Sequence, residues 1–187
     1  MTNEELKNAR IKAQEIKYRY ITINFIKDLF SGYTISNISG TPIDCGVDVR
    51  FTAITHNGNV ITYDVEVKER NKSKENIIKY PNSELKKSKY NSMKESHHNK
   101  HLIYIQYINS KWAMIYDVDK LNLDERKTED WLIKKTEYDD NSEYIVVPTY
   151  FIPYAEKKLK INVEKYYIDY ALYLQAKKEK QLQTQLF

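Results

Sequence analysis

The chain has 187 residues, of which 41% are hydrophobic and 30% charged, and its formal net charge is +4. A chain of this length can bury one sizeable core, so we expect a single domain over residues 1–187. No apolar run approaches the roughly 20 residues of a membrane-spanning helix, and the single Cys45 excludes an intramolecular disulfide. The segment MTNEELKNAR lacks the basic and apolar pattern of an export signal, so we expect a soluble, cytoplasmic protein with no membrane partner.

The first expected element is a long helix. Thr2 and Glu5 have the spacing of a capping box, which predicts a helix from this point to about Phe30. Ser31-Gly32 ends it, and the alternation over 33–38 predicts a first strand. The residues that we expect on the core face of the helix are Ala9, Ala13, Ile16, Tyr20, Ile23 and Phe30.

The stretch 46–70, GVDVRFTAITHNGNVITYDVEVKER, predicts a β-hairpin around Asn57-Gly58. A two-residue loop would set carboxylates against valines on both faces. A three-residue loop with Gly58 in the left-handed conformation instead leaves one face wholly apolar, and we expect this register. Its apolar pairs are Val47 with Val67, Val49 with Val65, Phe51 with Tyr63 and Ala53 with Ile61.

The opposite face of the hairpin carries charged residues. Asp48 faces Glu66, Arg50 faces Asp64, and Lys68 follows Glu66 by two residues. Like charges directly opposite each other are destabilising, so Asp48 and Glu66 predict a compensating cation. Carboxylate oxygens favour Mg²⁺ or Mn²⁺, which complete their shells with water and substrate phosphate. An ammonium at Lys68 would then stabilise charge that develops on a phosphate.

Asp48 followed on the next strand by Glu66-Val67-Lys68 resembles the PD-(D/E)XK nuclease superfamily, which includes restriction endonucleases, archaeal Holliday-junction resolvases and phage nucleases. The resemblance covers about residues 6–118. It implies an α/β, restriction-endonuclease-like core, in which helices flank a central mixed sheet in the order helix, three strands, helix, strand. Residues 119–187 would add a C-terminal strand and helix extension.

The resemblance also implies a Mg²⁺-dependent (or Mn²⁺-dependent) deoxyribonuclease. Asp48 and Glu66 would bind the metal, and Lys68 would position the attacking water or stabilise the transition state. Val47 stands where the family has a proline, and Pro42-Ile43-Asp44 lies just upstream, so Asp44 is an alternative ligand. Because the pattern is degenerate, two other interpretations stay open: a solvated strand face, and a non-catalytic domain of the same fold that binds nucleic acid or protein.

Two further residues are auxiliary candidates through the resemblance. Some family members have a metal-binding glutamate on the first helix, for which Glu15 is the nearest match, although Glu15 would also suit an ion pair with Arg19. In the family, the helix after the Glu-x-Lys strand lies beside the active site and often offers it a polar or basic residue. Lys89 is the candidate there, with a solvated surface lysine as the alternative.

Downstream of Lys68 we expect a polar loop, broken by Pro81, and then a helix from Glu84 to about Ser96. Lysines are frequent in this region, and we expect them to contact phosphates, which gives affinity without sequence readout. They are Lys72, Lys74, Lys79, Lys86, Lys87 and Lys94. The pattern does not distinguish DNA from RNA, or endonuclease from exonuclease action.

The last third of the chain predicts further elements. Residues 102–108 and 112–118 read as strands that turn at 109–111, the first of which should complete the sheet. We expect a short helix at 129–133 and a strand at 144–152, split at Pro148, which favours a sheet edge. A closing helix over 162–181 carries a tyrosine stripe that is typical of packing and would also suit a homodimer interface.

Overall fold

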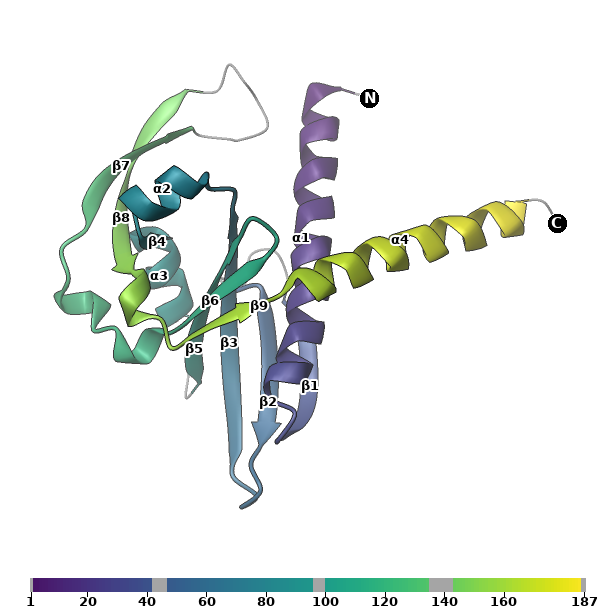
Figure 1. Cartoon of the computed structure of the whole chain (residues 1–187), viewed down its shortest axis with the longest axis horizontal. Helices are drawn as coiled ribbons and strands as arrows, with labels where there is room; N and C mark the ends of the chain where they lie inside the picture. Colours follow the sequence, from purple (N-terminus) through teal and green to yellow (C-terminus); the bar gives the residue numbers. More distant parts are fainter. Residues whose placement is uncertain (1, 42–46, 96–99, 135–142, 186–187) are drawn as a thin grey trace.

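Two sheets organise the computed structural model, which describes residues 2–41, 47–95, 100–134 and 143–185 (Figure 1). Within these ranges no helix is long and apolar enough to cross a membrane. The helices are α1 (Asn3–Leu29), α2 (Lys74–Lys79), α3 (Lys87–Glu95) and α4 (Glu164–Gln185), with short 3-10 helices at Val118–Lys120, Leu123–Glu125 and Tyr154–Glu156. The strands are β1 (Thr34–Gly40), β2 (Val49–Ile54), β3 (Val60–Arg70), β4 (Asn82–Lys86), β5 (His101–Ile108), β6 (Trp112–Asp117), β7 (Glu129–Lys134), β8 (Tyr144–Pro153) and β9 (Leu159–Asn162).

The central sheet has the order β1-β2-β3-β5-β6-β9, and only its β3–β5 pair is parallel. Residues of α1 and α4 pack on one face, and residues of α3, β4 and β8 pack on the other. The predicted α/β class, with a central mixed sheet flanked by helices, is confirmed. The expected order of helix, three strands, helix and strand is also present, with α2 and β4 inserted before α3.

The hairpin of β2 and β3 has the predicted register from Val49 onwards. The predicted pair of Val47 with Val67 is not formed, because the ladder ends at Val49; Val47 packs in the core cluster of α3 and β4, whereas Val67 belongs to the cluster on the other face. Val49 pairs with Val65, Phe51 with Tyr63 and Ala53 with Ile61. Gly58 has a φ of +78°, the left-handed conformation that the three-residue loop requires. Because alternate side chains share a face, the inner residues of both strands enter the core together, and Val49, Phe51, Ala53 and Val65 are fully buried.

The first helix begins where its capping box predicts, with Thr2 as N-cap and Glu5 bonded back to it. Its fully buried apolar residues are Ile21, Phe25 and Ile26, which were not predicted, and the predicted Tyr20, Ile23 and Phe30 pack half-buried against the same core. Ile16 is 49% exposed because the N-terminal half of α1 extends beyond the sheet (Figure 1). Helical spacing alone therefore extended the stripe too far towards the N-terminus, to the exposed Ala9, Ala13 and Ile16, since it cannot show where the supporting sheet ends.

The predicted loop and helix between 71 and 96 were partly wrong. Ser73 caps the short helix α2 inside the expected loop. Glu84 lies in the middle of β4 instead of starting a helix, and the helix α3 begins at Lys87. The reason is tertiary, because β4 pairs with β8, whose residues lie far along the chain. Glu84, for example, pairs with Phe151.

The smaller sheet has the order β4-β8-β7 and corrects two further predictions. Residues 129–133 form β7 and not a helix. The strand β8 is the middle strand and is not split at Pro148. Pro148 pairs with Asp130 on β7, whereas the pairing with β4 starts only at Thr149. Within the described residues Pro148 thus has a strand on one side only, which its missing N–H permits.

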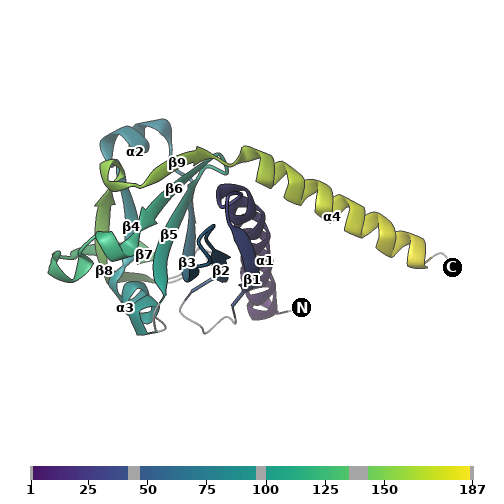
Figure 2. The ribbon, with the colours of Figure 1, turned by 90° about the horizontal axis from the view of Figure 1, so that it is seen from below.

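The C-terminal elements complete the central sheet and its helical layer. Strand β9 pairs with β6 at one edge. The tyrosine stripe of α4 packs against α1, with the ring of Tyr20 at 5.3 Å from Tyr170 and 4.9 Å from Tyr173. The packing role of these tyrosines is therefore confirmed. Beyond this contact, α4 projects away from the rest of the molecule, as Figure 2 shows.

Candidate active site

A row of charged side chains follows one face of β3. Glu66, Lys68 and Arg70 are two residues apart, so the pleat directs them to the same side, towards α3 and β4. They line a pocket of about 320 Å³ whose remaining walls come from β4, α3 and β5. Its lining residues are Glu66, Lys68, Arg70, Glu84, Leu85, Lys86, Ser88, Lys89, Ser92 and Tyr104.

Asp48 stands at the end of the β2–β3 ladder, beside Glu66. The regular pairing stops at Val49 with Val65, and the Asp48 N–H donates to the Val65 carbonyl at 2.9 Å. The Asp48 carboxylate then accepts from the Val67 N–H at 2.8 Å. A side-chain oxygen thus replaces the missing ladder bond, and this bond holds the carboxylate next to Glu66.

Glu66 is a buried carboxyl group that lies next to a second carboxylate, that of Asp48. It is 7% exposed, and burial together with the charge of Asp48 raises its pKa well above the usual range. The Lys89 ammonium, from α3, lies 3.0 Å from Oε2 and opposes this rise in part. Oε2 nevertheless accepts no well-directed hydrogen bond from any described residue. The site is therefore suited to a cation that approaches both carboxylates.

The two carboxylates fit a hard divalent ion. No group of three or more His, Cys, Asp or Glu side chains is close enough to ligate a metal within the described ranges. Mg²⁺ commonly needs only one or two protein carboxylates, because water and substrate phosphate provide its other ligands. Asp48 and Glu66 supply this oxygen set, and Oε2 of Glu66, which is 3.0 Å from Lys89 but accepts no well-directed hydrogen bond from a described residue, is one of its oxygens.

Of the two predicted auxiliary residues that the structure describes, Lys89 lies at the site and Glu15 does not. Glu15 lies on α1, which packs on the opposite face of the sheet, and it is not among the residues that line the pocket. Asp44, the alternative ligand, lies outside the described residues, as does Cys45. Lys89 reaches Glu66 because α3 follows β4 directly and crosses the pocket.

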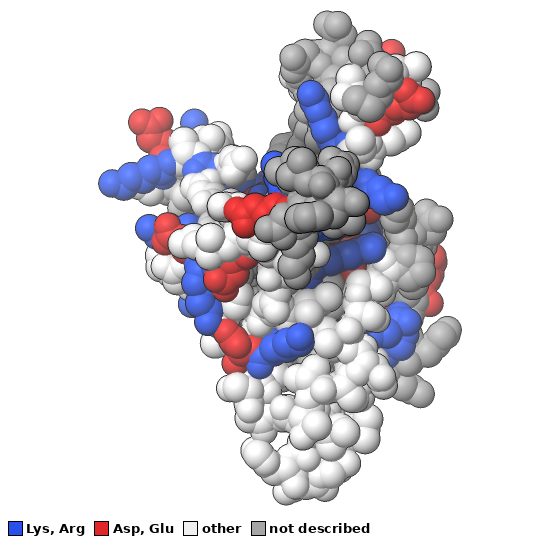
Figure 3. Space-filling view, turned by 90° about the vertical axis from the view of Figure 1, so that its right-hand side faces the viewer, with Lys and Arg blue, Asp and Glu red and all other residues white. Residues whose placement is uncertain are grey.

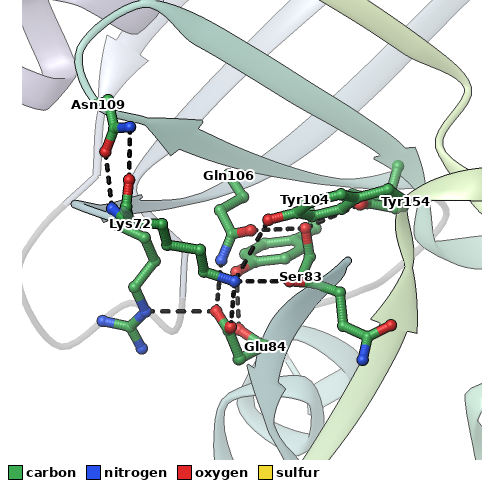
Figure 4. Close-up of polar contacts among 10 residues, drawn as sticks. Lys72, Ser83, Glu84, Tyr104, Gln106, Asn109 and Tyr154 are labelled. Atoms are coloured by element: carbon green, nitrogen blue, oxygen red, sulfur yellow. Dashed lines mark hydrogen bonds and ion pairs between the residues drawn. The ribbon is translucent and has the colours of Figure 1, made fainter. Parts of the chain in front are cut away.

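Lys72 does not fit its predicted role as a phosphate contact. Its side chain is only 11% exposed, and Nζ lies 2.5 Å from Glu84 Oε1. The same ammonium donates to the Asn82 carbonyl and to the Tyr154 hydroxyl (Figure 4). Its positive charge is used to satisfy a buried carboxylate, so we leave Lys72 out of the candidate nucleic-acid surface.

The other predicted lysines stand around the pocket or on the surface near it. Lys86 lines the pocket, and Lys87 is exposed at the start of α3. Lys74 and Lys79 are exposed on α2. Lys94 forms an exposed ion pair with Asp124, with Nζ at 2.7 Å from the carboxylate.

By contrast, the tip of the β2–β3 hairpin carries no lysine or arginine. No Lys, Arg, Asp or Glu occurs from Phe51 to Tyr63, and Figure 3 shows this lower end of the molecule without charged residues. A polyanion would thus be attracted to the end of β3 that carries Lys68 and Arg70, and not to the hairpin tip.

Glu84, Arg70 and Tyr104 are pocket residues that the sequence analysis missed. Glu84 was assigned to a helix start, yet it is buried and accepts from Gln106 Nε2 at 2.7 Å and Arg70 Nε at 3.4 Å (Figure 4). The alternation Glu66, Lys68, Arg70 could have revealed Arg70. Tyr104 donates to the Glu84 carbonyl, a tertiary contact for which the sequence has no local signal.

No family model matches the sequence, and no curated protein matches it. Among solved structures, the chain is similar to a Holliday-junction resolvase from the archaeal hyperthermophile Archaeoglobus fulgidus. The TM-score is 0.38 and the identity 12%, over 76% of this chain and 96% of the resolvase chain. At such values the function has to be inferred from the geometry of the pocket alone.

Proposed function

We propose that the chain is a divalent-metal-dependent nuclease that hydrolyses phosphodiester bonds in DNA. The observation that carries the proposal is the pair of adjacent carboxylates, Asp48 and Glu66, at one end of a pocket that also contains Lys68 and Lys89. Two carboxylates next to ammonium groups provide a cation site and an anion site side by side. Phosphoryl chemistry requires both.

Asp48 and Glu66 would hold Mg²⁺ or Mn²⁺. Burial and the negative charge of Asp48 disfavour the ionised form of Glu66, and the Lys89 ammonium offsets this effect only in part. A divalent cation would therefore stabilise both carboxylates. When bound, the ion would add positive charge at the phosphate and favour ionisation of a water molecule.

The lysines would act on the phosphate itself. Lys68 follows Glu66 by two residues on the same face, so its ammonium would lie beside a phosphate that approaches the two carboxylates. In this position it would stabilise negative charge that develops during attack and orient the attacking water through a hydrogen bond. The buried Leu85 and Tyr104 in the pocket wall would keep bulk water away and strengthen these interactions.

The approach of DNA would depend on the exposed basic residues nearby. Lys87 on α3 and Lys74 and Lys79 on α2 are exposed, and Lys86 lines the pocket. Such residues contact phosphates and position the strand without reading bases. Lys94 would contribute after exchanging Asp124 for a phosphate, since both groups of this ion pair are exposed.

Cleavage assays on the full chain test this proposal. Linear, nicked, branched and single-stranded DNA would be incubated with Mg²⁺, Mn²⁺ or EDTA, and the products separated on denaturing gels. We expect metal-dependent cleavage that is lost in Glu66→Ala and Asp48→Asn and retained in Glu164→Gln, which changes an exposed carboxylate on α4. Cleavage by Glu66→Ala at the wild-type rate would refute the proposal, and so would no cleavage of any substrate by the wild-type chain.

A further inference from the structure

The strand β7 is an open edge of the smaller sheet. The order β4-β8-β7 leaves no described strand on its other side, and its pairing with β8 is continuous from Glu129 to Lys134. In Figure 1 the two strands form a curved ribbon on the side of the molecule away from α4. Alternate residues of an edge strand direct their N–H and C=O groups outwards, so this edge presents a row of main-chain donors and acceptors.

The outer part of the ribbon has little support from the rest of the sheet. β8 pairs with β4 only from Thr149 onwards, so among the described strands residues 144–148 pair with β7 alone. A two-stranded ribbon is marginally stable in water, whereas three or more strands make a stable sheet. A further strand along β7 would therefore stabilise the ribbon.

Apolar side chains gather on the same ribbon. Leu132 and Val146 form a cross-strand pair and are each 59% exposed. Soluble proteins usually protect such an edge with a proline, a bulge or an inward-facing charge. The middle of β7 is instead Trp131-Leu132-Ile133, and no register shift interrupts its pairing with β8. The edge thus lacks the usual protection against association.

The charges of β7 match those of a second copy of the same strand. The strand begins with Glu129-Asp130 and ends at Lys134, with apolar residues between them. Two copies that pair antiparallel about a twofold axis place the acidic start of each opposite the basic end of the other. Opposite charges across a strand pair are favourable and like charges are not. The pattern is therefore self-complementary in the antiparallel direction and not in the parallel one.

The pleat selects one register for this pairing. Residues that face each other across a strand pair point to the same side of the sheet, so even-numbered residues of β7 face even-numbered ones. With Leu132 opposite itself, Asp130 faces Lys134 of the second copy, and Trp131 faces Ile133. A shift of the centre to position 131 or 133 would put a charged residue opposite Leu132 instead.

We propose that the chain forms a homodimer in which the β7 strands of two copies pair antiparallel about a twofold axis at Leu132. The two smaller sheets then join edge to edge into one. The tyrosine stripe of α4 does not serve this purpose, because it packs against α1. The centre of the Trp131 ring lies 5.5 Å from the guanidinium carbon of Arg70, so the interface adjoins the pocket of each copy. The dimer is independent of the nuclease function, since neither Asp48 nor Glu66 lies on β7.

Sedimentation equilibrium of the full chain tests the dimer. One chain has a mass of 22.3 kDa, and the dimer has twice this mass. An interface of one strand edge is at the small end for protein dimers, so we expect the dimer mass at high protein concentration and dissociation on dilution. The mass of a single chain at every concentration would refute the proposal.

A charge swap tests the antiparallel register. Asp130→Lys alone puts two lysines opposite each other on both sides of the axis, and Lys134→Asp alone puts two aspartates there. Both contacts become repulsive in each variant, so we expect association to weaken about tenfold or more. An equimolar mixture of the two variants restores both opposite-charge contacts and should recover wild-type association. Undiminished association of the single variants, or no recovery in the mixture, would contradict this register.

The matched controls are Asp169→Lys and Lys177→Asp, which make the same changes of net charge at exposed positions of α4. They should leave association unchanged. Circular dichroism of all four variants checks that each one is folded. If the α4 variants dissociate and the β7 variants do not, the dimer forms through α4 and the proposed interface is refuted.

A cysteine cross-link locates the axis. Cys45 is the single cysteine, so Cys45→Ser gives a background without thiols. In this background Leu132→Cys faces its own copy across the axis, within the reach of a disulfide, and should give a covalent dimer on non-reducing gels after oxidation. Val60→Cys, at a 67% exposed position of β3, is the control and should stay monomeric. No covalent dimer from Leu132→Cys, or an equal yield from Val60→Cys, would refute an axis at Leu132.

Discussion

Replacing Glu66 by Gln should stabilise the metal-free protein at neutral pH. The substitution keeps the shape of the side chain and removes its charge. Glu66 is 7% exposed, and burial and the Asp48 charge raise its pKa well above the ordinary value of 4.5. The folded state therefore favours the protonated, neutral carboxyl group, which Gln imitates at every pH.

The sign of the pH dependence follows from proton binding. Between 4.5 and the raised pKa, the folded protein keeps a proton on Glu66 that the unfolded chain has released. The free energy of unfolding of the wild type then falls as the pH rises through this window, by about 1.4 kcal/mol for each pH unit. Gln does not titrate, so the advantage of Glu66→Gln grows across the window and is constant above it.

Glu69 provides a control of opposite sign on the same strand. Burial would raise its pKa, but hydrogen bonds from Tyr18 and Ser110 and the charge of Lys17 outweigh burial, and the pKa is lowered. Ionised Glu69 thus stabilises the fold above the ordinary Glu value, and this contribution is lost as the pH falls through the lowered pKa. Glu69→Gln should destabilise the protein most at neutral pH and least in acid.

The assay is urea unfolding in EDTA, followed by circular dichroism at several pH values. Wild type, Glu66→Gln and Glu69→Gln would be compared at each pH, and the wild type also with Mg²⁺. A bound ion stabilises in proportion to the logarithm of its concentration above its Kd, so the wild type should gain more from Mg²⁺ than Glu66→Gln. A Glu66→Gln protein that is less stable than wild type at neutral pH would refute this account of the carboxyl pair.

Three further substitutions probe other parts of the structure. Lys72→Met should lower the free energy of unfolding by about 3 kcal/mol. This is the low end for breaking a buried ion pair, because Glu84 keeps its other partners. A loss below about 1 kcal/mol in urea unfolding would contradict the buried pairing. Replacing both Lys86 and Lys87 by Glu should reduce the slope of log affinity against log salt for duplex DNA by about 1.8 if both lysines contact phosphate. An unchanged slope in anisotropy titrations would place the DNA-binding surface elsewhere. Gly58→Ala should lower the free energy of unfolding by about 1 kcal/mol in thermal unfolding. The reason is the φ of +78° at Gly58, since there is open space around the added methyl group. A neutral effect would argue against the three-residue turn.

Local sequence determined the hairpin and the helix start. The turn at Gly58 and the alternation of apolar residues act over a few positions, and together they specify the register that brings Glu66 and Lys68 to one face. The capping box at Thr2 and Glu5 is equally local. In each case the residues that decide the structure are neighbours along the chain, so their pattern can be interpreted without knowledge of the fold.

Tertiary structure decided what surrounds that face. Glu84 became a buried strand residue because β4 pairs with β8, and Trp131 lies in a strand for the same reason. The partner of β4 is distant in the chain and that of β7 is the next strand, and in both cases the pairing with β8 overrides local helix preference. The burial of Lys72 against Glu84 and the approach of Lys89 to Glu66 follow from how β4 and α3 cover the sheet. Lysines in one basic segment thus have different surroundings, because only the packed structure determines which ammonium is enclosed and which meets solvent.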